Sequence, residues 1–289
     1  MEIDILNLNK KYGKVEALKN VNLKIGKGLY GLLGRNGAGK TTLLRILATL
    51  ISKSDGEIFI NGISITNSKK IRKIIGYLPQ NFSTYPNMSV WKSMEYFDLL
   101  SEMPVKTRKK RIEILLKQVN LWEKRKCKVK HLSGGMRQRL GVALALINEP
   151  QIIIVDEPTA GLDPEERIRL RNMLSDLAKD KIVILSTHIV DDISATCKKL
   201  GVLHEGKLLF DGEAKELEHI ALDKVFTVSK EDDIPSGAEI INKVNGKIRI
   251  LSNVSPSGEY EKVMPTLEDG YIELIRNGGY KNEINQNGM

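Results

Sequence analysis

Cysteine, histidine, aromatic residues and long hydrophobic runs are all scarce in this chain of 289 residues. Its two cysteines, Cys127 and Cys197, have no metal-like spacing, which excludes a cysteine zinc site or a disulfide framework and indicates free thiols in a reducing compartment. The best apolar run, Leu140 to Ile147, is much shorter than the roughly 20 residues that span a bilayer. The N-terminus has neither the basic nor the apolar region of a signal peptide. These absences predict a cytoplasmic protein.

Positive charge is in excess but is concentrated in one segment. The chain has 45 lysines and arginines against 36 acidic residues, a net charge of +9. Residues 106–130 contain 11 of the basic residues and only two acidic ones, Glu113 and Glu123, so this window holds the whole excess. Trp122 is the only aromatic residue in it, which disfavours a nucleic-acid surface that stacks bases. The window is therefore interpreted as a solvated helix face or a surface turned toward a membrane.

A glycine-rich stretch near the N-terminus carries the strongest functional signal. Residues 34–41 read Gly-Arg-Asn-Gly-Ala-Gly-Lys-Thr, the phosphate-loop pattern of two glycines that bracket four residues and precede Lys and Thr. An apolar run over 29–33 predicts a buried strand before it, and helical spacing continues to Leu47. Backbone N–H groups in such a turn, together with the helix N-terminus, surround a phosphate. The residues expected to bind a nucleoside triphosphate are Asn36, Gly37, Ala38, Gly39, Lys40, Thr41 and Thr42.

Two of these side chains have separate roles in the motif. Lys40 is expected to reach the β- and γ-phosphates, and the Thr41 hydroxyl to ligate Mg²⁺. An ordinary glycine turn between a strand and a helix is the structural alternative.

The apolar pattern predicts an α/β fold. Residues 3–8 and 17–25 alternate apolar and polar, which indicates an antiparallel hairpin, and strands follow over 55–62 and 74–78. Residues 89–130 keep only helical spacing, so a helical subdomain is expected over about 81–133.

Beyond this insert, apolar strands alternate with helices. Strands over 152–155 and 182–186 separate helices over 134–147, 164–179 and 189–198, which indicates a parallel sheet covered on both faces. An edge hairpin follows over 201–210.

The composition shifts near residue 221. Strands over 225–228 and 247–251 and a helix over 267–275 predict a small α/β appendage over 221–289, after a main domain over 1–220. The last residues, 277–289, are expected to be disordered.

Two further polar stretches sit where a ligand is expected. Asp156 and Glu157 follow the apolar strand 152–155, and ligands of open α/β sheets bind at the carboxyl ends of strands. Asp156 is expected to hold Mg²⁺ and Glu157 to accept the proton of an attacking water, although a capping role for the next turn is the alternative. Ser133 is a good helix N-cap, and Gly134 and Gly135 leave N–H groups bare for a second anion.

In this order and spacing, the phosphate loop, Leu132-Ser133-Gly134-Gly135-Met136 and Asp156-Glu157-Pro158 resemble the ATP-binding-cassette (ABC) ATPases. Four further stretches of residues 2 to about 220 are similar to that family. Tyr12 matches the aromatic that stacks on adenine, Gln80 the glutamine that links Mg²⁺ and water to the membrane partner, residues 161–164 the loop that contacts the opposite subunit, and His188 the histidine that contacts the γ-phosphate. Singly, Tyr12 could be a hairpin aromatic, Gln80 a loop residue and His188 a core histidine or a helix cap. Arg35 departs from the family, where Pro or a small residue is frequent.

The resemblance implies an active ATPase with the P-loop fold of ABC type: a mixed sheet core, an antiparallel β subdomain, a helical subdomain and, here, the C-terminal appendage. It implies ATP and Mg²⁺ as cofactors, with Lys40, Gln80, Glu157 and His188 in catalysis and Thr41, Gln80 and Asp156 at the metal. In the family two cassettes pack head to tail. Residues 133–135 of one would then grip the γ-phosphate that Lys40 of the other holds.

The resemblance also implies partners. These are a second cassette, expected to be a copy of this chain, and a separate transmembrane permease that places the chain at the inner face of the cell membrane; no nucleic acid is expected. The stretches 28–33 and 265–269 are similar to bacterial cassettes that export drugs, antibiotics, lipids or glycans.

Two other functions compete with the exporter. The basic window also fits a soluble cassette ATPase that acts on the ribosome or on nucleic acid, although such proteins usually carry two cassettes or long insertions. The second competing function is that of a nucleotide sensor that does not hydrolyse ATP. The presence of Glu157 and His188 argues against it.

Overall fold

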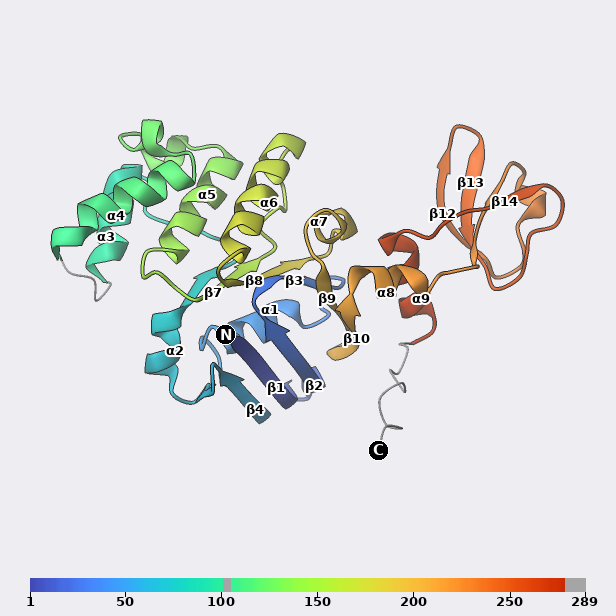
Figure 1. Ribbon diagram of the computed structural model, residues 1–289, viewed down its shortest axis with the longest axis horizontal. Coiled ribbons are helices and arrows are strands. Elements are labelled where there is room, and N and C mark those ends of the chain that lie inside the picture. The colour runs from blue at the N-terminus through green and yellow to red at the C-terminus, as the bar shows by residue number, and fades with distance from the viewer. Residues whose placement is uncertain (101–104, 279–289) are drawn as a thin grey trace.

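The computed structural model describes residues 1–100 and 105–278, and a six-stranded sheet lies at its centre (Figure 1). The strand order is β10-β9-β3-β8-β7-β6, and all neighbours are parallel except β10 and β9. The strands are β3 (Gly28–Leu33), β6 (Ile75–Leu78), β7 (Ile152–Asp156), β8 (Ile182–Thr187), β9 (Lys199–His204) and β10 (Lys207–Glu213). The predicted parallel sheet and its edge hairpin are confirmed.

Helices and a second sheet cover the two faces of the central sheet. Strand β7 is apolar up to Val155 because its side chains are buried on both of these faces. Ile153 and Val155 pack into one hydrophobic cluster, while Ile152 and Ile154 pack into another on the opposite face. The first face carries α5 (Gly134–Ala145), α6 (Pro164–Ala178) and α7 (Val190–Ser194), and the second carries α1 (Lys40–Leu47). Since both faces are buried, β7 cannot alternate apolar with polar residues.

The second sheet is antiparallel, with the order β2-β1-β4-β5. Its strands are β1 (Glu2–Tyr12), β2 (Val15–Gly26), β4 (Asp55–Ile60) and β5 (Ile63–Ser64). This confirms the predicted N-terminal hairpin. A short helix that the sequence analysis did not predict, α2 (Ser68–Ile74), begins after the N-cap Asn67.

The predicted helical insert is present at one end of the molecule (Figure 1). It consists of α3 (Val90–Leu99), α4 (Val105–Gln118) and two short 3₁₀ helices, η1 (Trp122–Lys124) and η2 (Val129–His131). Its apolar residues join the cluster on the α5 face, so the insert packs directly on α5.

The helix predicted over 189–198 is shorter than expected, because α7 ends at Ser194. The Thr196 hydroxyl donates to the carbonyl of Asp192 at 2.6 Å, and the chain enters β9 at Lys199, whose partner is Tyr30 of β3. Pairing in the sheet therefore overrides helical spacing at this point. No helix among residues 1–100 and 105–278 is long and apolar enough to cross a membrane.

The C-terminal region contains a third sheet, at the opposite end of the molecule from the helical insert (Figure 1). Two strands were predicted, but the sheet has four, in the order β12-β13-β11-β14. The elements are α8 (Ala214–His219), β11 (Val225–Val228), η3 (Glu231–Asp233), β12 (Glu239–Val244), β13 (Lys247–Leu251), β14 (Tyr260–Lys262) and α9 (Leu267–Arg276).

Helix α9 returns from this sheet to the main core. Leu267 and Leu274 pack in the same cluster as α5 and α6, and a Cβ at Gly270 would lie 1.9 Å from the carbonyl oxygen of Leu217 in α8. A boundary at residue 220 therefore divides the third sheet from the main domain but leaves α9, which follows it in the chain, packed on the main domain. The division into domains over 1–220 and 221–289 stays a prediction. The disorder predicted for 277–289 falls, apart from residues 277 and 278, outside the described residues.

Candidate nucleotide site

The phosphate loop lies between β3 and α1, as the sequence predicts, and its glycines are required by the backbone. Gly37 and Gly39 have φ of 82° and 107°, a region that favours glycine, and Gly39 is the N-cap of α1. A Cβ at Gly34 would lie 2.3 Å from the carbonyl oxygen of Leu203 in β9. The loop is therefore fixed between neighbouring strands with the N-terminus of α1 open to a ligand.

A pocket of about 380 Å³ opens over this loop. Most of the predicted nucleotide-binding residues line it, together with two further residues, Ala17 and Arg35. The lining residues are Ala17, Arg35, Asn36, Gly37, Gly39, Lys40, Thr41, Thr42, Gln80 and Glu157. Ala38 is buried behind the loop instead. The fold thus brings Gln80, which follows β6, and Glu157, which follows β7, to the phosphate loop.

Three predicted catalytic side chains form a chain of contacts at the pocket. The Lys40 ammonium lies 3.0 Å from Glu157 Oε1 and donates to the Gly34 carbonyl at 2.6 Å. Glu157 Oε2 lies 2.6 Å from His188 Nδ1. Lys40 and Glu157 are buried, whereas the His188 side chain is 42% exposed. One carboxylate is therefore shared by a buried cation and a solvent-accessible imidazole.

The neighbouring carboxylate, Asp156, is fully buried at the end of β7. Its Oδ1 accepts a hydrogen bond from the Ser186 hydroxyl at 2.5 Å, while its Oδ2 has no hydrogen-bond partner among the described residues. Burial of a carboxylate oxygen without a partner is costly unless a cation or donor is supplied from elsewhere. Glu157 itself has φ of 49°, a conformation that non-glycine residues adopt rarely and often at functional sites.

The other predicted site residues lie outside this pocket. Tyr12 is at the end of β1, 46% exposed, with the Lys10 ammonium 4.8 Å from its ring centre. Ser133 caps α5 by accepting from the Met136 N–H at 3.2 Å and is exposed together with Gly134. Gly135 is buried, and a Cβ there would lie 2.4 Å from Glu166 Oε2. None of these residues lines the pocket over the phosphate loop of their own chain.

Two polar residues around the site, Ser186 and Asp192, were not predicted from the sequence. Ser186, at the end of β8, bonds Asp156 and accepts from the backbone N–H of Glu157 at 3.1 Å. Asp192 of α7 is buried, and its Oδ2 accepts from Thr159 at 2.5 Å and from Thr187 at 3.4 Å. The polar residues at the end of β8, which neighbours β7 in the sheet, were the available signal for Ser186. No signal pointed to Asp192, since its closer partner in space, Thr159, is 33 residues away in sequence.

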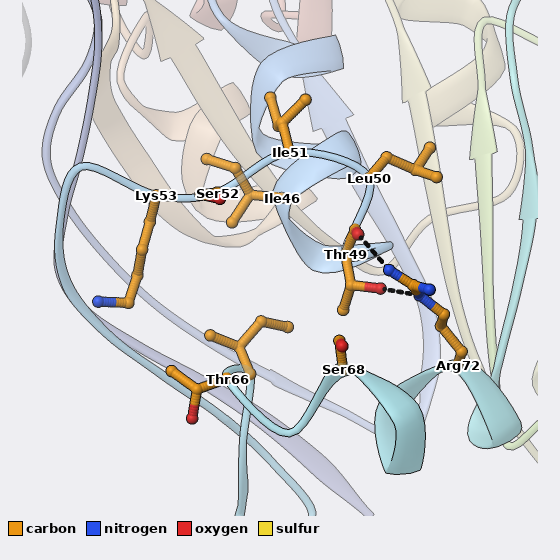
Figure 2. Close-up of a pocket in the computed structure, with 10 residues that line it drawn as sticks. Ile46, Thr49, Leu50, Ile51, Ser52, Lys53, Thr66, Ser68 and Arg72 are labelled. Carbon is orange, nitrogen blue, oxygen red and sulfur yellow. Dashed lines mark hydrogen bonds between the residues drawn. The ribbon is translucent and has the colours of Figure 1, made fainter.

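A second pocket, of about 310 Å³, lies at the other end of α1 (Figure 2). Arg72 and Thr49 lie at one side of it, where Arg72 donates to the hydroxyl of Thr49 at 2.8 Å and to its carbonyl at 3.2 Å, and Leu50 lies beside them. None of the predicted site residues lines this pocket, so it is separate from the phosphate loop.

Comparisons with known proteins agree with this geometry. Residues 18–160 match the family described as ABC transporter. The uncharacterised ABC transporter ATP-binding protein YxlF of Bacillus subtilis is 35% identical to the chain, over 94% of this chain and 99% of its own length. The Nod factor export ATP-binding protein I of Ralstonia nicotianae is 34% identical, over 81% of this chain and 74% of its own length.

The structural likeness is of the same kind. A dimeric ATP-binding cassette in a post-hydrolysis state, bound to ADP and Pi, has a TM-score of 0.66 and 29% identity to this chain, over 73% of this chain and 98% of its own. The predicted P-loop fold of ABC type is confirmed. The chain belongs to the ABC transporter family, as an ATP-binding subunit and an ATP hydrolase of that type.

Proposed function

We propose that this subunit powers an exporter whose membrane-spanning permease is a separate chain, and that it works at the inner face of the membrane. The proposed substrate is a drug, an antibiotic, a lipid or a glycan. A relative matched over most of its length is named for Nod factor export, and one matched over 99% of its length is named an ATP-binding protein. The proposal that the subunit hydrolyses ATP through these residues rests on the contacts from Lys40 through Glu157 to His188.

In this proposal the phosphates of ATP bind in the pocket over α1. The Lys40 ammonium contacts the β- and γ-phosphates, and the N–H groups at residues 36–42 point to the phosphates at a helix N-terminus. Tyr12 stacks on the adenine. Because Lys40 also contacts Glu157 at 3.0 Å, phosphate and carboxylate compete for the same ammonium, and binding loosens this ion pair.

Asp156, Thr41 and Gln80 are the residues that would hold Mg²⁺. The buried Oδ2 of Asp156, which has no hydrogen-bond partner in the described chain, fits a divalent cation held directly or through water. Thr41 and Gln80 supply oxygen atoms at the wall of the nucleotide pocket, and Asp156 lies behind that wall, next in the chain to Glu157, which lines it. Bound Mg²⁺ neutralises charge that develops on the phosphate oxygens.

Glu157 is the proposed general base. Its carboxylate accepts the proton of the attacking water, and His188, 2.6 Å away, positions the carboxylate and contacts the γ-phosphate. The fixed φ and the hydrogen bonds from the Glu157 N–H to Ser186 hold the base in place, so little reorganisation is needed during the reaction.

The remaining donors come from a second copy of the chain. Ser133 and Gly134 are exposed at the N-terminus of α5, outside their own nucleotide pocket, and so are accessible to the γ-phosphate bound by a partner cassette. A related cassette that is dimeric with ADP and Pi supports this arrangement.

Two measurements test the proposal. The mass of purified Glu157→Gln protein, determined by light scattering with and without Mg-ATP, should double with ATP; a protein that binds ATP and stays monomeric would contradict the homodimer. Fractionation of producing cells should place the chain with membranes only when its permease is present. Sedimentation with ribosomes, reversed by ribonuclease, would overturn the exporter in favour of a translation-associated ATPase.

A further inference from the structure

The segment that joins the helical insert to α5 carries a row of exposed lysines. Lys124, Lys126, Lys128 and Lys130, here called the lysine row, are all exposed. The residues between them, Arg125, Cys127 and Val129, are partly or fully buried. The segment consists of the end of η1, a turn, an isolated bridge at Lys128 and the start of η2, and within these seven residues, 124–130, four lysine side chains are exposed to solvent.

Backbone hydrogen bonds hold the row in place. Residues 125–130 run antiparallel to residues 86–91, and their N–H and C=O groups bond in four places at 2.9–3.0 Å. The donor and acceptor pairs are Val90 to Cys127, Trp91 to Arg125, Val129 to Met88 and Lys130 to Pro86. The backbone that carries the row is therefore bonded to the start of the helical insert.

The charge of the row is not compensated within the described part of the chain. None of its lysines forms an ion pair there, and Glu123 is the only acidic residue over 119–135. Two basic residues of the neighbouring α4 are paired instead, Arg111 with Glu149 and Lys117 with Glu113. Four like charges held close together repel one another, and an anionic surface relieves that repulsion.

The aromatic residues beside the row distinguish a lipid surface from a nucleic acid. The Trp122 ring is covered by cations, with the Arg125 guanidinium 4.2 Å and the Lys117 ammonium 5.3 Å from its centre, so it is not available to stack a base. Tyr85 precedes Pro86, which bonds Lys130, and is 46% exposed. The Tyr85 ring packs edge-on against Tyr96, and exposed tyrosines are enriched at the level of lipid headgroups.

We propose that the lysine row, with Tyr85, binds the anionic headgroups of a membrane. This goes beyond the proposed exporter, because it gives the cassette a contact with lipid that does not depend on a permease. The row lies just before Ser133 in the chain, so the lipid contact is close to the start of α5. Each lysine near an anionic surface contributes about fivefold to partition, equivalent to about 1 kcal/mol.

The test is co-sedimentation of the purified full chain with vesicles, without any permease. Wild-type protein should bind vesicles of phosphatidylcholine and phosphatidylglycerol, lose binding as salt is raised, and bind vesicles of phosphatidylcholine alone several hundredfold more weakly. Replacement of the four lysines of the row by Gln should lower partition into the anionic vesicles by the same several hundredfold.

A matched control removes the same charge elsewhere. Gln at four exposed lysines that form no ion pair within residues 1–100 and 105–278, namely Lys69, Lys207, Lys215 and Lys230, should leave partition within a fewfold of wild type. Equal losses in the two variants would show only a net-charge effect and overturn the proposal. Wild type that ignores anionic vesicles, or binds a single-stranded RNA oligonucleotide through the row more tightly than it binds vesicles, would overturn it too. Both variants should have the melting temperature and the ATP turnover of wild type, which excludes misfolding as the cause of weaker binding.

Discussion

Replacement of Glu157 by Gln separates nucleotide binding from hydrolysis. The side chain is 4% exposed and contacts Lys40 at 3.0 Å and His188 at 2.6 Å. At an effective dielectric constant of about 20, two unit charges 3 Å apart attract by about 5 kcal/mol before desolvation is subtracted. The amide keeps the size of the side chain but removes both this attraction and the ability to accept a proton.

Two opposite effects are expected from this single change. Turnover should fall about 10²–10⁴-fold, the usual contribution of a general base. The affinity for ATP should be equal to that of wild type or higher, because the γ-phosphate no longer competes with a carboxylate for Lys40. Phosphate release in a single turnover measures the first effect, and equilibrium dialysis with labelled ATP measures the second.

The control is Glu57→Gln, an exposed glutamate of β4 outside the pocket, which should leave both quantities unchanged. Turnover of Glu157→Gln within threefold of wild type would refute the assignment of the base. Loss of ATP binding in the same variant would show that the carboxylate supports the pocket and does not act on water.

Three further changes test other parts of the structure. Gly39→Ala should weaken ATP binding at least tenfold and lower the melting temperature, since φ is 107° and a Cβ would lie 2.6 Å from the Ala17 carbonyl oxygen; equal affinity by dialysis would contradict the loop geometry. Burial of Asp269 opposes its charge, but hydrogen bonds from Arg249 and from Thr266 outweigh it and hold the pKa below its usual value. The stabilisation is thus complete above the unfolded pKa of about 4 and is lost as the pH falls through the lower folded value, so Asp269→Asn should cost about 3 kcal/mol in urea unfolding at pH 7 and less in acid. Burial raises the pKa of the Cys197 thiol to about 12, so iodoacetamide at pH 8 should label Cys127 first; equal labelling by mass spectrometry would contradict the burial.

Local signals explain why so much of the centre could be predicted. The phosphate loop needs glycine at Gly37 and Gly39 because of the backbone there, and those residues are visible in sequence. Strands β7 and β8 are buried along their whole length, so their composition alone indicates a parallel sheet. Carboxylates directly after such strands predict the ligand edge.

The parts that sequence did not predict depend on partners far along the chain. Strand β12 is mostly exposed on both faces and has no apolar alternation, and its place is set by pairing with β13. Asp192 gains its role only when α7 meets Thr159 and Thr187. Helical spacing continued past Ser194, yet the need to pair β9 with β3 ended the helix there.

The residues at the start of α5 are expected to bind a nucleotide, but in a single chain they lie outside the nucleotide pocket. Gly135 is required by packing, since any side chain there would meet Glu166, which is held 3.2 Å from Arg139 in a buried ion pair, whereas a Cβ at Gly134 would have room. Ser133 already caps the helix, and the exposed N-terminus has no place in the pocket of the same chain. A helix N-terminus kept bare, rigid and exposed is suited to an anion that arrives from outside. In a nucleotide-dependent ATPase we expect that anion to be the γ-phosphate of a second copy, so that hydrolysis requires two chains.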